Sequence, residues 1–161
     1  MKTLIMTILI VITLHAQSIE KDWLSLSHKE REVIMSSYYK GLQYNLGFSL
    51  AAICWHESLG GRWQLTVGEM SSDYGLYHIN IYWYLKEIKV KDTMWNRSRY
   101  ATILMTQPDV AETYVINKLQ TLVKAYNGDY NKVWTAYNGS KVYANSIRVK
   151  VKFLQNKILG L

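Results

Sequence analysis

The sequence contains a single cysteine, Cys54, so no disulfide can form within the chain. It also contains one proline, Pro108, and nine glycines among 161 residues, and it has no low-complexity segment. This composition leaves little sequence for linkers between domains. A chain of this length in which 49% of the residues are hydrophobic is instead predicted to fold as one domain stabilised by packing.

The sequence has no apolar run long enough for a membrane helix. Residues 3–14 are uncharged and apolar, but a spanning helix needs about 20 such residues. Lys2 precedes this run, and Ala16 follows it as a small residue suited to a cleavage site. Residues 1–16 are therefore predicted to be a signal peptide and residues 17–161 the mature domain, without a stable membrane span. A retained membrane anchor is the alternative.

The chain also lacks the motifs of several enzyme classes. It shows no phosphate-binding loop, no metal-ligand cluster and no nucleophilic triad, so no cofactor and no metal are expected. The net charge of +7 favours an anionic partner. Because export is predicted, we expect cell wall rather than nucleic acid. Aromatic residues make up 13% of the chain, and they can stack on sugars, but most are assigned to the core.

The hydrophobic periodicity predicts a mainly α (α+β) protein. Ser27 and Glu30 have capping-box spacing at the start of the first helix, and Pro108 suits the first turn of a later one. Helices are predicted at residues 27–41, 47–58, 82–88, 99–106, 108–126, 130–138 and 143–158. Residues 60–80 have no helical period, and they are predicted to form a long loop or small hairpin.

Glu57 is the principal candidate for chemistry. It follows Leu50, Ile53 and Cys54 along an apolar stripe of the second helix, so its carboxyl should lie at the edge of the core. Burial raises the pKa of a carboxyl group, and a protonated carboxylic acid can donate its proton to a leaving oxygen. The alternative is a glutamate at a helix end that points into solvent. Cys54 is predicted to be buried and without a catalytic role.

Three short stretches place Glu57 in a wider pattern: residues 51–58 (AAICWHES), 74–80 (YGLYHIN) and 136–139 (AYNG). Together, over about residues 45–145, they resemble the lytic transglycosylase family (SLT domain), which has the lysozyme-like fold. The string Ala-Tyr-Asn-Gly also occurs at residues 125–128, where an apolar stripe ends and Asn-Gly suits a turn. That first copy is therefore predicted to be a helix end rather than a site.

The resemblance implies that Glu57 acts as general acid and then as general base. It implies that Ser58 supports the active-site hydrogen bonds, that Tyr137 orients Glu57 and that Asn138 lies close by. The substrate would be the peptidoglycan glycan strand, cut between N-acetylmuramic acid and N-acetylglucosamine to leave a 1,6-anhydro end. The periplasm would be its location, and a secretion or conjugation machine of the envelope a candidate partner. The implied substrate-binding residues are Ser58, Tyr74, Gly75, Leu76, Tyr77, His78, Ile79, Asn80, Trp83, Tyr137 and Asn138.

The chain departs from the family at Tyr77 and His78, which stand where a Met-Gln pair is usual. Asp73 adds a second resemblance, to the chicken-type lysozymes, in which an Asp before Tyr-Gly is the second catalytic carboxylate. Two carboxylates would permit retaining hydrolysis with Asp73 as nucleophile or ion stabiliser. An Asp that caps a turn is the alternative. A peptidoglycan-binding module without turnover also remains open, and Glu69 is a further loop acid without an assigned role.

Overall fold

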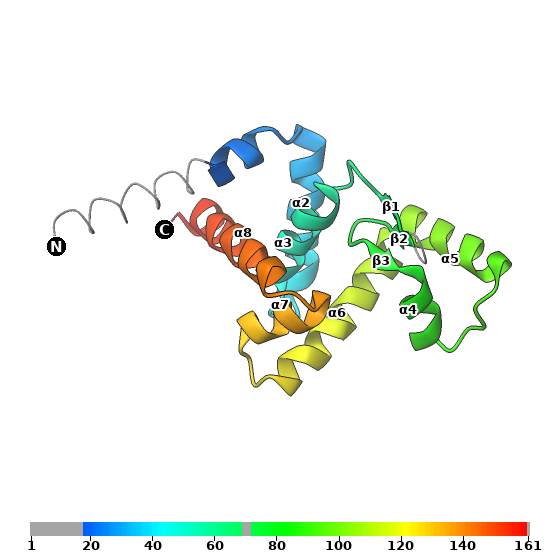
Figure 1. Ribbon diagram of the computed structural model, residues 1–161. Coiled ribbons are helices and arrows are strands. Elements are labelled where there is room, and N and C mark those ends of the chain that lie inside the picture. The colour runs from blue at the N-terminus through cyan, green and yellow to red at the C-terminus, as the bar shows by residue number, and fades with distance from the viewer. Residues whose placement is uncertain (1–17, 69–71, 161) are drawn as a thin grey trace.

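The computed structural model describes residues 18–68 and 72–160 (Figure 1). The predicted signal peptide, residues 1–16, and Glu69 lie outside the described residues. Within them the fold is mainly helical with one small sheet, which confirms the predicted fold class. No helix in this described part combines the length and the apolar character needed to cross a membrane.

Helices account for most of the described chain. Residues 18–24 are helical, and α2 to α8 follow. Their bounds are α2 His28–Leu42, α3 Gly47–Ser58, α4 Ile81–Glu87, α5 Met94–Thr106, α6 Pro108–Ala125, α7 Tyr130–Asn138 and α8 Lys141–Leu159. The predicted helix at 99–106 begins five residues too late, because the hydroxyl of Thr93 accepts a hydrogen bond from the Asn96 amide and caps α5 there.

Local signals set most of the helix ends. Ser27 and Glu30 form the predicted capping box of α2, and the Asp129 carboxylate caps α7 by accepting from the Lys132 amide. Asn127 and Gly128 both have positive φ, so the first Ala-Tyr-Asn-Gly string ends a helix as predicted. The second copy ends at Gly139, which is the left-handed C-cap of α7.

The buried α3 is at the centre of the core. It packs against α2 on one side and against α8 on another (Figure 1). Trp55 on α3 is completely buried, and its ring meets Trp23 edge-on at 5.0 Å and Phe153 at 5.6 Å between ring centroids. Because α3 is enclosed in this way, its last turn carries Glu57 from the core to the edge of the molecule.

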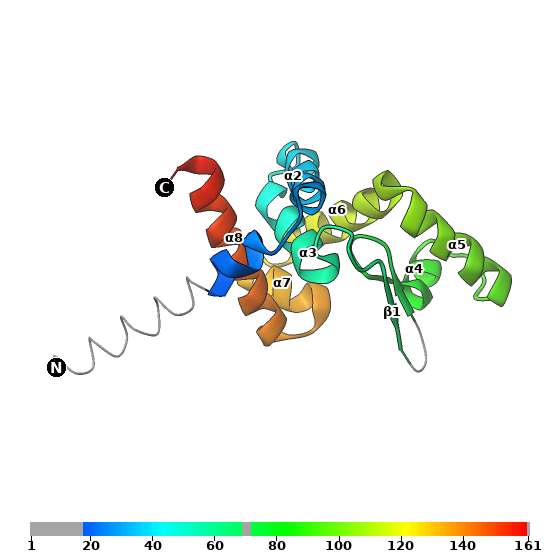
Figure 2. The ribbon, with the colours of Figure 1, turned by 90° about the horizontal axis from the view of Figure 1, so that it is seen from above.

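A lobe made of the sheet, α4 and α5 lies beside the helical bundle (Figure 2). The described residues between 60 and 80 contain a three-stranded antiparallel sheet, which is more than the predicted loop or small hairpin. Its strands are β1 Leu65–Val67, β2 Ser72–Tyr74 and β3 Ile79–Asn80. Asp73 on β2 pairs with Thr66 on one side and Asn80 on the other. This register fixes Asp73 in the central strand of the sheet.

Candidate functional site

A pocket of about 480 Å³ lies where the lobe meets the bundle. The last turn of α3 contributes to it, together with β2, β3, α4, α6 and α7. Most of the predicted site residues line this pocket: Glu57, Asp73, Tyr77, His78, Ile79, Asn80, Trp83, Tyr137 and Asn138. The three motifs that are separated in the sequence therefore meet at one place.

The Glu57 side chain is only 15% exposed in this pocket. Burial raises the pKa of its carboxyl to about 7. Contact with the Tyr143 hydroxyl lowers this pKa, and the negative charge of Asp73 raises it. The predicted rise in the pKa of Glu57 is thus confirmed, and the group is half protonated near neutral pH. It can release a proton to a bound molecule and take one back within the same pH range.

His78 lies next to Glu57 in a constrained position. Its φ of 43° is in the left-handed region, and its Nε2 lies 2.9 Å from the carbonyl oxygen of Trp63. Because a carbonyl oxygen can only accept, Nε2 carries the hydrogen. In the neutral ring Nδ1 then carries the lone pair, and this atom lies 3.6 Å from Oε2 of Glu57 and 3.4 Å from Oγ1 of Thr66. The Nδ1 atom of His78 therefore lies beside the Glu57 carboxyl, just beyond hydrogen-bond distance.

Asp73 supplies a second carboxylate to the same pocket. It lies within strand β2 and not at the cap of a turn, which excludes the alternative role considered for it. The amide nitrogen of Asn80 donates a hydrogen bond of 2.7 Å to Oδ1 of Asp73, while the amide oxygen of Asn80 accepts from the Trp83 backbone and caps α4. Asn80 thus fixes both Asp73 and the start of α4, which carries the half-exposed indole of Trp83.

A second tyrosine, besides the predicted Tyr137, lies near the carboxyl of Glu57. The hydroxyl of Tyr143 on α8 interacts with Glu57, whereas no hydrogen bond joins Tyr137 to Glu57 in the described structure. Tyr137 lines the pocket and stacks on Tyr143, with 6.1 Å between centroids and 25° between planes. Tyr137 and Tyr143 therefore both lie close to Glu57, and the role of Tyr137 in orienting Glu57 stays a prediction. No sequence motif singled out Tyr143, because α8 follows the last motif.

The side chain of Tyr77 does not offer a flat face to a ligand. Its ring is 1% exposed, and its hydroxyl lies 2.9 Å from Oγ of Ser37 and 3.2 Å from Oε1 of Glu112. Both partners are buried on the helices α2 and α6. Tyr77 was among the residues expected to bind substrate, but its buried ring offers no surface for stacking on a sugar. Its hydroxyl instead anchors the loop that carries His78.

Four of the predicted substrate-binding residues lie outside the pocket lining. Ser58 is completely buried, and its hydroxyl donates to the Cys54 carbonyl and accepts from the Gly61 amide, so it stabilises the end of α3. Gly75 packs against the backbone of Leu104 on α5. The remaining two, Tyr74 and Leu76, are half-buried and pack against the core. These residues support the site rather than form its surface.

Three residues that line the Glu57 pocket were not predicted from the sequence. Tyr114 and Lys118 lie one turn apart on α6, and Glu87 ends α4. The Lys118 ammonium lies 5.1 Å from the centre of the Tyr137 ring, and Glu87 interacts with the Tyr114 hydroxyl. The i, i+4 spacing of Tyr114 and Lys118 beside the apolar stripe of α6 is the signal that would have placed both on one helix face.

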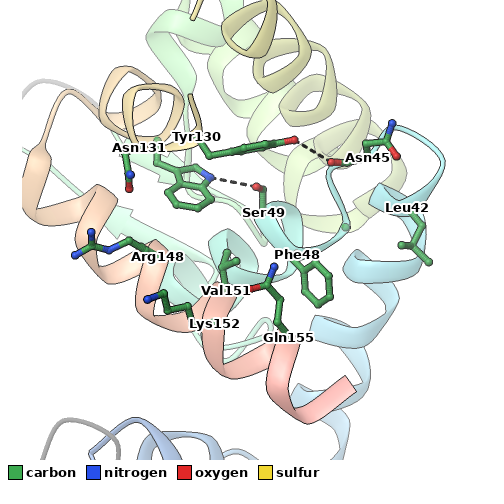
Figure 3. A pocket seen from close by; sticks show the side chains of 12 residues that line it. Leu42, Asn45, Phe48, Ser49, Tyr130, Asn131, Arg148, Val151, Lys152 and Gln155 are labelled. Atoms are coloured by element: carbon green, nitrogen blue, oxygen red, sulfur yellow. Dashed lines mark hydrogen bonds between the residues drawn. The ribbon is translucent and has the colours of Figure 1, made fainter. Parts of the chain in front are cut away.

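A second pocket, of about 530 Å³, is formed by α7, α8 and the turn between α2 and α3 (Figure 3). Trp134 donates from Nε1 to Oγ of Ser49 there, and the Tyr130 hydroxyl donates to the Asn45 carbonyl. Its lining includes Arg148 and Lys152 but no carboxylate. Of these two pockets, only the Glu57 pocket has carboxyl groups in its lining. Among the described residues no group of three His, Cys, Asp or Glu side chains could hold a metal ion.

Comparison with known proteins found no relative of this chain. No family model matches the chain, no curated protein matches it, and no solved structure matches it. The functional interpretation therefore depends on the motifs and on the geometry of the Glu57 pocket.

Proposed function

We propose that this protein is a lytic transglycosylase that cleaves the β-1,4 bond between N-acetylmuramic acid and N-acetylglucosamine in peptidoglycan. The observation that supports the proposal best is the carboxyl of Glu57, which is buried at the end of α3, has a pKa raised to about 7 and faces a pocket. Glycoside cleavage needs such an acid because a sugar alkoxide is a poor leaving group. Trp83 in the same pocket offers a half-exposed ring to a sugar.

In the proposed reaction, protonated Glu57 gives its proton to the glycosidic oxygen as the bond to the anomeric carbon breaks. The 6-hydroxyl of the muramyl residue then attacks that carbon, and Glu57 removes the hydroxyl proton. The result is a 1,6-anhydro ring and a regenerated acid, with no water consumed. His78 Nδ1, at 3.6 Å from Glu57, helps to hold the carboxyl group in place between the two proton transfers.

The proposal extends to the place of action. The net charge of +7 suits an anionic polymer such as the wall, and a predicted signal peptide suits the periplasm. In this setting the enzyme would open the wall locally for a secretion or conjugation machine. These parts of the proposal depend on the sequence resemblance and not on the pocket.

Mass spectrometry of the soluble products from purified peptidoglycan tests the proposal. We expect anhydromuramyl ends from the wild type and a loss of at least about a hundredfold in rate for Glu57→Gln, which cannot donate the proton. Glu32→Gln, a change of the same type at an exposed carboxylate on α2, is the matched control and should keep full activity. A Glu57→Gln variant that cleaves at the wild-type rate would refute the assignment.

Hydrolysis with two carboxylates is the second candidate function. The specific observation in its favour is that Asp73 lines the same pocket and that its charge raises the pKa of Glu57. In this case the products would carry reducing muramyl ends, and Asp73→Asn would stop the reaction. If the Asp73→Asn variant still yields anhydromuramyl products, the role of Asp73 is limited to raising the pKa of Glu57. Binding to peptidoglycan without any product would favour a binding module that lacks turnover.

A further inference from the structure

The end of the lobe that is remote from the bundle carries an unusual exposed surface. We call it the α5 tip and define it by Met94 and Trp95 together with the basic residues Lys89, Lys91 and Arg99. The side chain of Met94 is 88% exposed and that of Trp95 is 76% exposed. Figures 1 and 2 show that this end of α5, with the loop before it, projects away from the bundle. Two adjacent large apolar side chains at such exposure indicate a surface that meets an apolar partner.

The charge around the two apolar residues is positive. Residues 86–99 contain five basic and two acidic side chains. One of the acids, Asp92, is neutralised by Arg97, whose Nε and Nη2 lie 2.6 and 2.7 Å from its two carboxylate oxygens. The other, Glu87, is engaged with Tyr114 in the Glu57 pocket. The exposed Lys89 and Lys91 form no ion pair within the described residues, so their charge is available to an anionic partner.

The arrangement on α5 is that of an interfacial anchor. Trp95 and Arg99 are four residues apart and share one face of the helix. An amphipathic indole favours the level of lipid headgroups, and a neighbouring cation can meet a lipid phosphate. Another exposed apolar set, Trp63, Leu65 and Val67, lacks this charge, since the nearby Arg62 is held by Glu30. Of these two exposed apolar sets, the α5 tip is the one that combines apolar side chains with unpaired positive charge.

We propose that the α5 tip binds the surface of a membrane that contains anionic lipid. A protein partner fits the tip less well, because a stable protein interface buries about 800 Å² on each side with complementary shape. A projecting corner with two large apolar side chains presents much less. A lipid surface needs no complementary shape, and it accepts these side chains at the boundary between headgroups and acyl chains. The proposal is independent of the chemistry assigned to Glu57.

Co-sedimentation with phosphatidylcholine vesicles, with and without phosphatidylglycerol, tests this proposal. We expect binding to the anionic vesicles that weakens as salt is added, since screening acts over about 10 Å at 0.1 M salt. The double variant Met94→Ser with Trp95→Ser should bind about tenfold more weakly. Lys89→Gln and Lys91→Gln should each weaken binding about fivefold. These exposed positions allow the variants to fold.

Val142→Ser is the matched control, because Val142 is 76% exposed on α8 and lies outside the tip. All variants are compared in the same chain, and a chain that starts at residue 17 is measured beside it, so that residues 1–16 do not account for a difference. Quenching of tryptophan emission by brominated lipid should be lost mainly in Trp95→Ser. The proposal is overturned if the tip variants bind vesicles as the wild type does. It is equally overturned if the wild type does not bind anionic vesicles and the tip instead binds a protein.

Discussion

The protonation of Glu57 is governed by a small number of contacts at the end of α3. Burial disfavours the carboxylate, the Tyr143 hydroxyl favours it, and the charge of Asp73 disfavours it again. The Tyr143 hydroxyl is itself buried and has no hydrogen bond of ordinary geometry in the described structure. Near neutral pH, a ligand oxygen that enters the pocket would therefore meet a carboxyl group that is present in both its protonated and its ionised form. Holding the carboxyl in this environment costs stability once the group ionises.

This cost leads to a prediction about Glu57→Gln. The pKa of the Glu57 carboxyl is about 7 in the folded state and 4.5 in the unfolded chain. Between these two pH values the folded protein therefore keeps a proton that the unfolded chain releases. The stability that Glu57 contributes is therefore full below pH 4.5 and is lost as the pH rises to 7. Glu57→Gln should be about 3 kcal/mol more stable than the wild type at pH 8, and close to it at pH 4.

Urea unfolding of the two proteins across this pH range measures the difference. Glu32→Gln is again the control, and its difference from the wild type should stay nearly constant with pH because Glu32 is exposed. If the stability curves of wild type and Glu57→Gln run parallel between pH 4.5 and 8, the carboxyl of Glu57 is not buried in the way described.

At the scale of elements, the sheet and α5 are held together by a close backbone approach. Gly75 follows β2 with a φ of +78°, and an added Cβ would lie 2.4 Å from the carbonyl oxygen of Leu104 on α5. No side chain fits at that distance, so the turn after β2 can approach α5 only with glycine. This contact positions the segment that leads from Asp73 to His78, and therefore the lobe side of the pocket.

Gly75→Ala should consequently destabilise the protein by about 3 kcal/mol or more, because strain at positive φ and a clash with Leu104 act together. Gly128→Ala is the matched control. Gly128 has nearly the same φ, +77°, but an added Cβ there meets nothing within 4 Å, so only the backbone strain of about 1–2 kcal/mol applies. Thermal unfolding of both variants gives the comparison. Equal losses would mean that α5 does not pack on the Gly75 turn.

At the scale of the whole molecule, a buried polar network joins the lobe to the bundle. Tyr77 lies next to His78 in the turn between β2 and β3. Its hydroxyl donates hydrogen bonds to Ser37 on α2 and to Glu112 on α6. Glu112 is 5% exposed, and burial raises the pKa of its carboxyl, while the hydrogen bond from Tyr77 lowers it. The network brings three separate parts of the chain together beneath the pocket.

Tyr77→Phe should therefore cost about 1–3 kcal/mol, since the buried Glu112 carboxyl loses a donor. Tyr143→Phe removes a buried hydroxyl that has no ordinary hydrogen bond among the described residues, so its cost in stability should be under about 0.5 kcal/mol. Denaturant unfolding of the two variants measures both values. A Tyr77→Phe variant as stable as the wild type would show that the lobe is held without this network.

The sequence by itself determined the features that depend on neighbouring residues. The capping box at Ser27, the cap at Asp129 and the left-handed turn at Gly128 act within a few residues of the chain. The starts of α2 and α7 and the end of α6 therefore follow from them. The apolar stripe before Glu57 is also a local pattern, and it predicted a carboxyl at the edge of the core. The helix by itself left open a glutamate that points into solvent, and only the packed structure decided for burial.

Only the tertiary structure decided which side chains meet Glu57 and which way Tyr77 points. Tyr143 comes from α8, which packs against α3, and Lys118 reaches the pocket from α6, which packs against α7. Both helices are distant from Glu57 in the sequence. Tyr77 turns into the core because Ser37 and Glu112 satisfy its hydroxyl there, and no local pattern specifies such partners. Contacts between distant elements are set by packing across the whole chain, whereas caps, turns and stripes are set within single turns of backbone.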